Sequence, residues 1–169
     1  MLQAPLQAPQ VQAPQKVSAP SAPILFKSPL FKSPEDYQVY RLSPDASNRI
    51  ALVFDPTVAK VSLTYCVEIF DVGGRTYPHR HRMSAELFFV LKGEGKAVCD
   101  DEVFPIQTGD SILMPPDGLH AIENSGSERL YTLCVMVPDE GFVDLIRSGI
   151  PTKLDEEDMA VLKRIDLLF

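Results

Sequence analysis

Short runs of apolar and β-branched residues, interrupted by polar turn residues, dominate the chain from Arg49 to Pro138. Several runs alternate between apolar and polar positions, and breaks rich in Gly, Pro, Asp or Asn recur roughly every eight to twelve residues. This pattern favours consecutive antiparallel β-strands in a sandwich or barrel over strands joined by crossover helices. The predicted strand-forming segments are 49–54, 60–70, 85–95, 96–106, 110–116 and 130–138.

The spacing of apolar residues becomes helical after Pro138. Gly149 and Pro151 divide this part into two segments, because glycine can cap a helix and proline prevents its continuation. We therefore expect short C-terminal helices within 139–169 that pack on the barrel or at a dimer interface. The second segment carries an apolar stripe formed by Met159, Leu162, Ile165 and Phe169.

The first 34 residues form a low-complexity arm in which Gln-Ala-Pro occurs three times and Leu-Phe-Lys-Ser-Pro occurs twice. Seven of the fifteen prolines lie here, so the arm favours extended polyproline conformations over strands or a long helix. We expect a disordered or loosely docked tail. The alternatives are a docking ligand for an aromatic-lined groove or for a neighbouring subunit, a segment that packs on the barrel, and a targeting segment. The predicted organisation is an arm at 1–34, a β-barrel at 35–138 and a helical segment at 139–169.

Composition narrows the functional classes. At 169 residues and 45% hydrophobic, the chain can bury one sizeable core. Its formal net charge of −7 argues against nucleic-acid and acidic-membrane partners, because phosphate binding depends on clustered Lys and Arg. Cys66, Cys99 and Cys134 are odd in number and widely spaced, so we expect free thiols in a reducing compartment. The sequence has no run of eighteen apolar residues and no secretory signal pattern, so the expected location is the cytoplasm.

The chain has only three histidines, and two of them, His79 and His81, are separated by one residue. In an extended strand such a pair points to the same face. If residues 82–85 form a turn, Glu86 begins the next strand and can face the two imidazoles. His120 follows a Pro- and Gly-containing turn and could complete the set from another strand. Imidazoles with a carboxylate suit Fe(II), Mn, Ni, Co or Zn.

These residues resemble the two sequence motifs of the cupin family. The first motif reads Gly, five residues, His-x-His, three or four residues, Glu, six residues, Gly; the second reads Gly, five residues, Pro-x-Gly, two residues, His, three residues, Asn. One position departs from this pattern, since Asp117 replaces the glycine of Pro-x-Gly, and we expect a slightly altered turn there. The matching positions are Gly73, His79, His81, Glu86, Gly93, Gly109, Pro115, His120 and Asn124.

The resemblance implies an all-β fold, a double-stranded β-helix or jelly-roll barrel with the Pro-rich arm and the C-terminal helices added to it. It also implies one divalent transition metal per chain (Mn, Fe, Ni, Co or Zn), with two coordination positions open to water or substrate. A homodimer is expected on the same basis. The metal ligands implied are His79, His81, Glu86 and His120.

The residues that line the pocket around such a metal depend on which strand faces point inward. Phe88 shares the face of Glu86 by strand alternation, and Met114 precedes Pro115, so both are candidates for an apolar wall. The segment 61–70 has one apolar and one mixed face, and only if the mixed face points inward do Cys66 and Glu68 approach the ligand. Tyr77 and Tyr131 are further pocket candidates. Three arginines near the histidines could steer an anionic substrate, with solvent exposure as their ordinary role: Arg75, Arg80 and Arg82.

The function expected from these features is a mononuclear metal-dependent enzyme acting on a small organic acid, a phenolic or a sugar derivative. The chemistry would be oxidation, decarboxylation, lyase or isomerase chemistry, and no catalytic side chain can be assigned from the sequence. The alternative is a non-catalytic cupin that binds or senses a small metabolite or sugar. Both hypotheses require the metal and a small-molecule ligand, and neither involves nucleic acid or a membrane.

Overall fold

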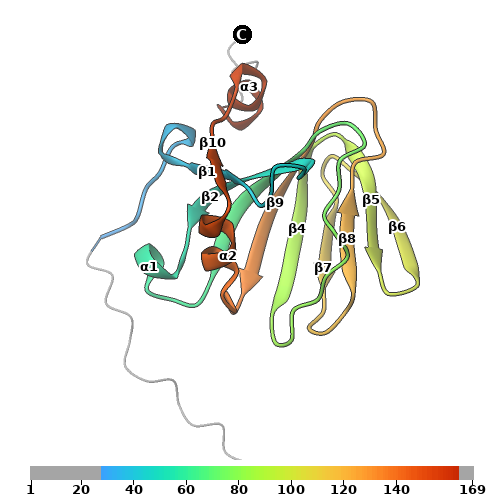
Figure 1. The fold of residues 1–169 in the computed structure, drawn as a ribbon, viewed down its shortest axis with the longest axis horizontal. Coiled ribbons are helices and arrows are strands. Elements are labelled where there is room, and N and C mark those ends of the chain that lie inside the picture. Colours follow the sequence, from blue (N-terminus) through green and yellow to red (C-terminus); the bar gives the residue numbers. More distant parts are fainter. Residues whose placement is uncertain (1–27, 164–169) are drawn as a thin grey trace, which may run out of the picture.

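The computed structural model describes residues 28–163, which form ten β-strands and a few short helices (Figure 1). The strands are β1 (Gln38–Arg41), β2 (Asn48–Phe54), β3 (Thr64–Phe70), β4 (Ala85–Lys92), β5 (Glu94–Cys99), β6 (Glu102–Gln107), β7 (Ser111–Met114), β8 (His120–Glu123), β9 (Leu130–Val137) and β10 (Ile150–Thr152). The helices are the 3-10 turn η1 (Pro34–Asp36), α1 (Pro56–Ala59), α2 (Phe142–Ser148) and α3 (Glu156–Lys163). No helix among these is long and apolar enough to cross a membrane.

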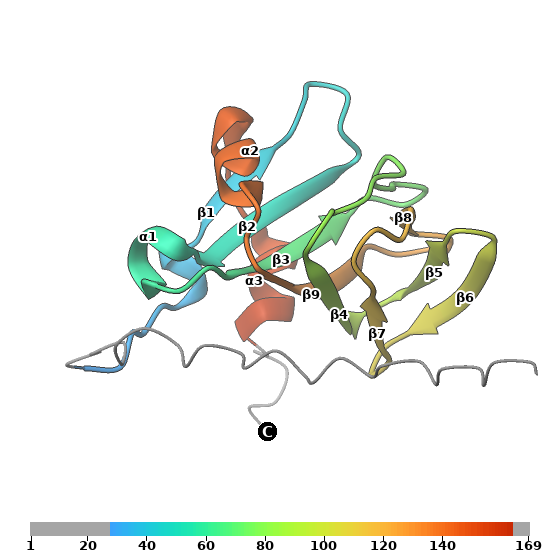
Figure 2. The ribbon, with the colours of Figure 1, turned by 90° about the horizontal axis from the view of Figure 1, so that it is seen from below.

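Two antiparallel sheets face each other (Figure 2). The larger sheet has the strand order β10-β1-β2-β3-β9-β4-β7, and the smaller one has the order β6-β5-β8. Every strand pair in both sheets is antiparallel. The predicted all-β antiparallel fold is therefore confirmed.

The core lies between the two sheets and combines side chains from both. The large sheet contributes residues such as Ile50 and Phe88, and the small sheet contributes residues such as Ala97 and Ile122. A second apolar cluster covers the opposite face of the large sheet, where Val161 of α3 packs against it. One face of the large sheet therefore points toward the core between the sheets, and α3 covers part of its other face.

Strand β3 shows which face of its segment points inward. Cys66 and Phe70 belong to the core between the sheets, whereas Val67 and Ile69 belong to the cluster on the outer face. Side chains alternate along a strand, so Glu68 also points inward. The mixed face of this segment is the inner one, and it brings polar groups into the barrel.

Turn residues of the two motifs adopt the left-handed backbone that their types allow. Gly93 has φ +93°, and a Cβ there would lie 2.7 Å from the carbonyl oxygen of Arg129. Asp117, which replaces a motif glycine, has φ +66°. Aspartate tolerates this region better than most residues, so the turn before His120 is retained.

Several local expectations differ from the structure. The predicted helical segment 139–169 contains a strand between its two helices, because β10 pairs with β1 in the large sheet. Strands β1 and β8 are too short to stand out as apolar runs. Most of the predicted arm, together with Ile165 and Phe169 of the predicted stripe, lies outside the described residues. The domain boundaries at 34 and 138 stay predictions.

Candidate metal centre

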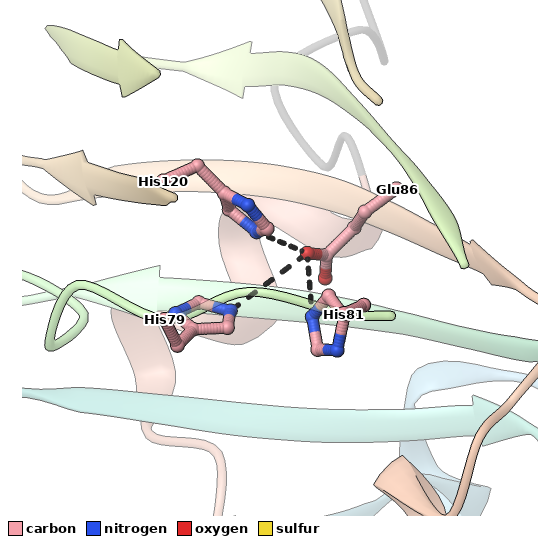
Figure 3. Close-up of side chains that lie close together, drawn as sticks. All are labelled: His79, His81, Glu86 and His120. Atoms are coloured by element: carbon pink, nitrogen blue, oxygen red, sulfur yellow. Dashed lines mark hydrogen bonds and ion pairs between the residues drawn. The ribbon is translucent and has the colours of Figure 1, made fainter. Parts of the chain in front are cut away.

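Four side chains from separate segments of the chain meet inside the barrel (Figure 3). His79 and His81 lie in the long connection between β3 and β4, Glu86 lies on β4, and His120 begins β8. One ligand-type atom from each side chain lies within 4.8 Å of the others. The Glu86 Oε2 atom is 2.9 Å from His120 Nε2, 3.3 Å from His81 Nε2 and 3.9 Å from His79 Nε2.

The segment that carries the histidine pair is not a regular strand, contrary to the extended strand that the spacing suggested. His79 forms an isolated bridge with His120, in which each backbone N–H donates to the other residue's carbonyl oxygen at 3.0 and 2.8 Å. Strand β4 pairs with β7 and β9, so Glu86 does not return alongside the histidines. The backbone bridge to β8 positions the pair instead.

Backbone carbonyls orient two of the three imidazole rings. His79 Nδ1 lies 2.8 Å from the Tyr77 carbonyl oxygen, and His120 Nδ1 lies 2.9 Å from that of Gly118. A carbonyl oxygen only accepts, so Nδ1 carries the proton in each ring. This leaves Nε2 as the atom that faces Glu86, which is the arrangement that second-sphere contacts impose on metal-binding histidines.

Charge at the cluster is concentrated on Glu86, whose side chain is 1% exposed. Burial acts to raise the pKa of this carboxyl, but contacts with His120, His81 and Cys134 outweigh it and lower the pKa to about 2. The Cys134 thiol donates to Glu86 Oε1 at 3.0 Å. Burial lowers the pKa of His79, which favours the neutral imidazole. At His120 burial also acts to lower the pKa, but the contact with Glu86 outweighs it and raises the pKa, so a metal ion would compete with a proton at this ring. An ionised carboxylate and neutral imidazole are the forms that bind metals.

The donor set fits a divalent transition ion. His81 Nε2 is buried and has no hydrogen-bond partner among residues 28–163, since its 3.3 Å approach to Glu86 lacks hydrogen-bonding geometry. A buried polar nitrogen without a partner costs free energy, and a metal ion at this point would remove that cost. Three imidazole nitrogens and one carboxylate oxygen are ligands that Fe, Mn, Ni, Co and Zn accept.

A cavity of about 500 Å³ adjoins two of the histidines, His79 and His81. Its lining surface is mostly apolar, with a few polar groups at its inner end and mouth. The residues that line it include Asn48, Ile50, Glu68, Tyr77, Phe142 and Leu145. A volume of this size is in the range of small-molecule sites.

Glu68 is the buried carboxyl group of this cavity and is 3% exposed. It accepts a hydrogen bond from Asn48 Nδ2 at 3.3 Å. Burial, followed by the negative charge of Glu86, raises the pKa of Glu68 to about 8. A proton on this carboxyl near neutral pH can be donated to a ligand.

The predicted pocket residues separate into three groups. Glu68 and Tyr77 line the cavity. Phe88 and Met114 are buried in the core close to Glu86, with Met114 directly opposite it on β7, but they do not border the cavity. Cys66 is buried opposite Cys134 and so lies behind the cluster.

The prediction for Tyr131 is wrong. Its ring belongs to the outer apolar cluster, and its hydroxyl donates to Asp158 Oδ1 on α3 at 3.1 Å. The reason is strand alternation on β9: Tyr131 lies opposite Ile69, which points outward, whereas Thr132 lies opposite Glu68.

The cavity residues that sequence reasoning missed include Asn48, Ile50, Phe142 and Leu145. These four come from β2 and α2, far from the histidines along the chain, and only a polar residue at the start of an apolar run hinted at Asn48. Of the three arginines, Arg75 and Arg80 border the cavity. The Arg80 guanidinium lies 3.9 Å from the Asp117 carboxylate, and its side chain is 54% exposed.

Comparison with known proteins identifies related sequences over the barrel. A family model described as "Cupin domain" matches residues 66–136. The chain is 40% identical over 70 residues to the uncharacterized protein MJ1618 of Methanocaldococcus jannaschii, covering 41% of this chain and 56% of that protein. It is 30% identical over 99 residues to protein SchB of Streptomyces halstedii, covering 56% and 72% respectively. An oxalate-binding protein of Thermotoga maritima is 32% identical over 59 residues, covering 35% and 49%.

Two of these matches span only about half of the relative's own length. Among solved structures, one from Thermotoga maritima described as a predicted oxalate decarboxylase superposes with a TM-score of 0.60. The superposition covers 64% of this chain and 99% of that chain at 20% sequence identity. A likeness at this identity concerns the fold alone.

Proposed function

This chain belongs to the cupin family, and on that premise we propose that it binds one divalent transition metal and uses it in a reaction on a small organic molecule. The proposed ligands to the metal are His79, His81, Glu86 and His120. When bound, the ion would act as a Lewis acid toward an oxygen atom of the substrate.

One observation carries this proposal. His81 Nε2 is buried without a hydrogen-bond partner in the described part of the chain, at the point where the other imidazole nitrogens and the Glu86 carboxylate converge. Unpaired buried polar groups are costly, and a metal ion at this point would give this nitrogen a partner. The backbone contacts of His79 Nδ1 and His120 Nδ1 hold their rings in position before a metal arrives.

The cavity supports a small organic ligand. It adjoins His79 and His81, and Arg75 and Arg80 at its border offer positive charge for an anionic group. The relative from Thermotoga maritima is named for binding oxalate, a small carboxylate. Glu68 favours catalysis over simple binding, because a buried carboxyl that holds a proton near neutral pH can serve as general acid or base.

Elemental analysis of the full chain, purified without a histidine tag or added metal, tests the metal site. We expect about one Fe, Mn, Ni, Co or Zn per chain, and less than about a tenth of that in His81→Ala. Arg82→Ala, which changes an exposed residue next to the pair, is the matched control and should retain the metal. Circular dichroism establishes that each variant is folded. No metal in the wild type, even after reloading with each ion, would refute the site.

The reaction is tested by incubating the metal-loaded protein with panels of organic acids, phenols and sugar derivatives, followed by mass spectrometry of products. A ligand that binds but is recovered unchanged would contradict the enzymatic proposal and favour a binding protein. We also propose a homodimer, which sedimentation as a monomer at micromolar concentration would contradict.

A further inference from the structure

A buried polar pair, Asn48 and Glu68, forms the inner end of the cavity beside the candidate metal centre. Asn48 is 6% exposed and Glu68 is 3% exposed. Apart from the Asn48 amide, no side chain in residues 28–163 donates a hydrogen bond to Glu68, and no basic group lies within ion-pairing distance of it. Buried carboxyl groups are normally paired, so this one has hydrogen-bonding capacity to spare.

The pair lies close to the proposed metal ligands. A Glu68 carboxylate oxygen lies within 4.8 Å of the Cys134 sulfur, and this sulfur is 3.0 Å from Glu86 Oε1. The Thr132 hydroxyl, on the residue opposite Glu68 in the sheet, is also buried without a hydrogen-bond partner among the described residues. Because Glu68, His79 and His81 line the same cavity, a small ligand in it can lie next to Glu68 and the proposed metal ligands at the same time.

The walls between these two polar ends are apolar. Ile50 and Leu145 line the cavity, and the Phe142 ring centroid lies 6.1 Å from that of His81. The cavity surface is mostly apolar and offers few hydrogen-bond partners for the many hydroxyl groups of a sugar, and burying these groups without partners is unfavourable. The apolar walls are suited to an aromatic ring, which gains contact area and edge or face packing with Phe142.

We infer that Glu68 and Asn48 bind a hydroxyl group of the ligand, and that this ligand is a small hydroxylated aromatic whose ring packs against Ile50 and Phe142 and whose anionic oxygen faces the metal centre. The inference rests on the proposed function, since the anionic end needs the metal. The Glu68 carboxyl accepts from the ligand hydroxyl when ionised and donates to it when protonated.

Isothermal titration calorimetry on the zinc-loaded full chain tests this assignment. The probes are benzoate, 3-hydroxybenzoate, 4-hydroxybenzoate and D-glucuronate. In both hydroxybenzoates the hydroxyl group is too far from the carboxylate for the two to chelate one ion. We expect one hydroxybenzoate to bind about tenfold more tightly than benzoate, as one hydrogen bond to a carboxyl would provide. In Glu68→Leu this gain should fall below about twofold. Glu68→Gln should retain part of it, and the exposed control Glu102→Leu should retain all of it.

Three results would overturn the ligand class: equal affinities of benzoate and both hydroxybenzoates, a gain that persists in Glu68→Leu, or tighter binding of D-glucuronate than of any benzoate. Failure of all four probes to bind the zinc-loaded protein would also overturn the ligand class. Zinc content is measured before each titration. Substoichiometric zinc in the wild type contradicts the proposed function, whereas full zinc without a hydroxyl-dependent gain contradicts only the ligand class.

Discussion

Glu68→Gln should stabilise the metal-free protein at neutral pH and change its stability by less than about 1 kcal/mol at pH 5. The pKa of Glu68 is raised from 4.5 to about 8, mainly by burial and then by the charge of Glu86. A carboxyl whose pKa is raised in the folded state binds a proton more tightly there than in the unfolded chain. Its contribution to stability is therefore complete below pH 4.5 and is lost as the pH rises toward 8.

The size of the effect follows from linkage. Between pH 4.5 and pH 7.5 the folded protein keeps a proton that the unfolded chain has released, and each pH unit costs about 1.4 kcal/mol. The cost at pH 7.5 is about 4 kcal/mol. Gln has the shape of a protonated Glu and releases no proton, so the variant avoids this cost. With a urea m value of about 2 kcal/mol per molar, the unfolding midpoint should rise by about 2 M at pH 7.5.

Urea unfolding followed by far-ultraviolet circular dichroism measures the difference at pH 5, 6, 7 and 8, after removal of metal by chelation. Titration of groups distant from Glu68 affects wild type and variant alike. Glu86, whose charge acts on Glu68, has a pKa of about 2 and is ionised throughout this pH range, so the difference between wild type and variant reports on Glu68. Glu102→Gln, at an exposed position, serves as control and should show no pH-dependent difference. A wild type as stable as Glu68→Gln at pH 8 would refute the reasoning, because Glu68 would then ionise at no cost.

Three further predictions concern the opposite face of the large sheet and the cavity wall. Asp158→Ala should lower the free energy of unfolding in urea by about 3–5 kcal/mol, because it removes the buried partner of the Arg49 guanidinium. The control Glu157→Ala, at an exposed position, should lower it by less than about 0.5 kcal/mol, and equal losses would contradict the buried pair. Tyr131→Phe should cost about 1 kcal/mol and leave zinc affinity unchanged, and a change in zinc affinity would contradict its outward position. Thr132→Val should be neutral or stabilising by up to about 1 kcal/mol, since its hydroxyl has no partner among residues 28–163; a loss of more than about 1 kcal/mol would be inconsistent with this.

The four-residue cluster of the candidate metal centre could be proposed from the sequence because most of its spacing rules are local. His79, His81 and Glu86 lie within eight residues, and the turn residues around them have the backbone that their types favour. Asp117 is an instructive case: the sequence departs from the family motif there, yet its φ of +66° is one that aspartate accepts. Reasoning about residue type predicted a slightly altered turn there, and the left-handed backbone of Asp117 is compatible with that prediction.

The cavity could not be predicted to the same degree, because long-range packing determines it. Phe142 follows Glu68 by more than seventy positions, and nothing in its own helical spacing indicates that it adjoins His81. The inward face of β3 depends on its pairing with β2 and β9, so the sequence left Glu68 conditional and allowed the wrong face for Tyr131. Strand β10 was not predicted, because a strand of three residues shows almost no alternation of apolar and polar positions.

The structural support for the site lies directly behind it. Neighbouring residues on one strand point to opposite faces, so Asn48 contacts Glu68 inside the barrel while Arg49 pairs with Asp158 of α3 outside, at 2.5 and 3.0 Å. Strand β9 repeats this arrangement, because Tyr131 also bonds Asp158 and Thr132 lies opposite Glu68. A buried ion pair adds little net stability, but it fixes the positions of the groups it joins. Helix α3 therefore links β2 and β9 through Asp158, on the face of the sheet opposite to Asn48 and Glu68.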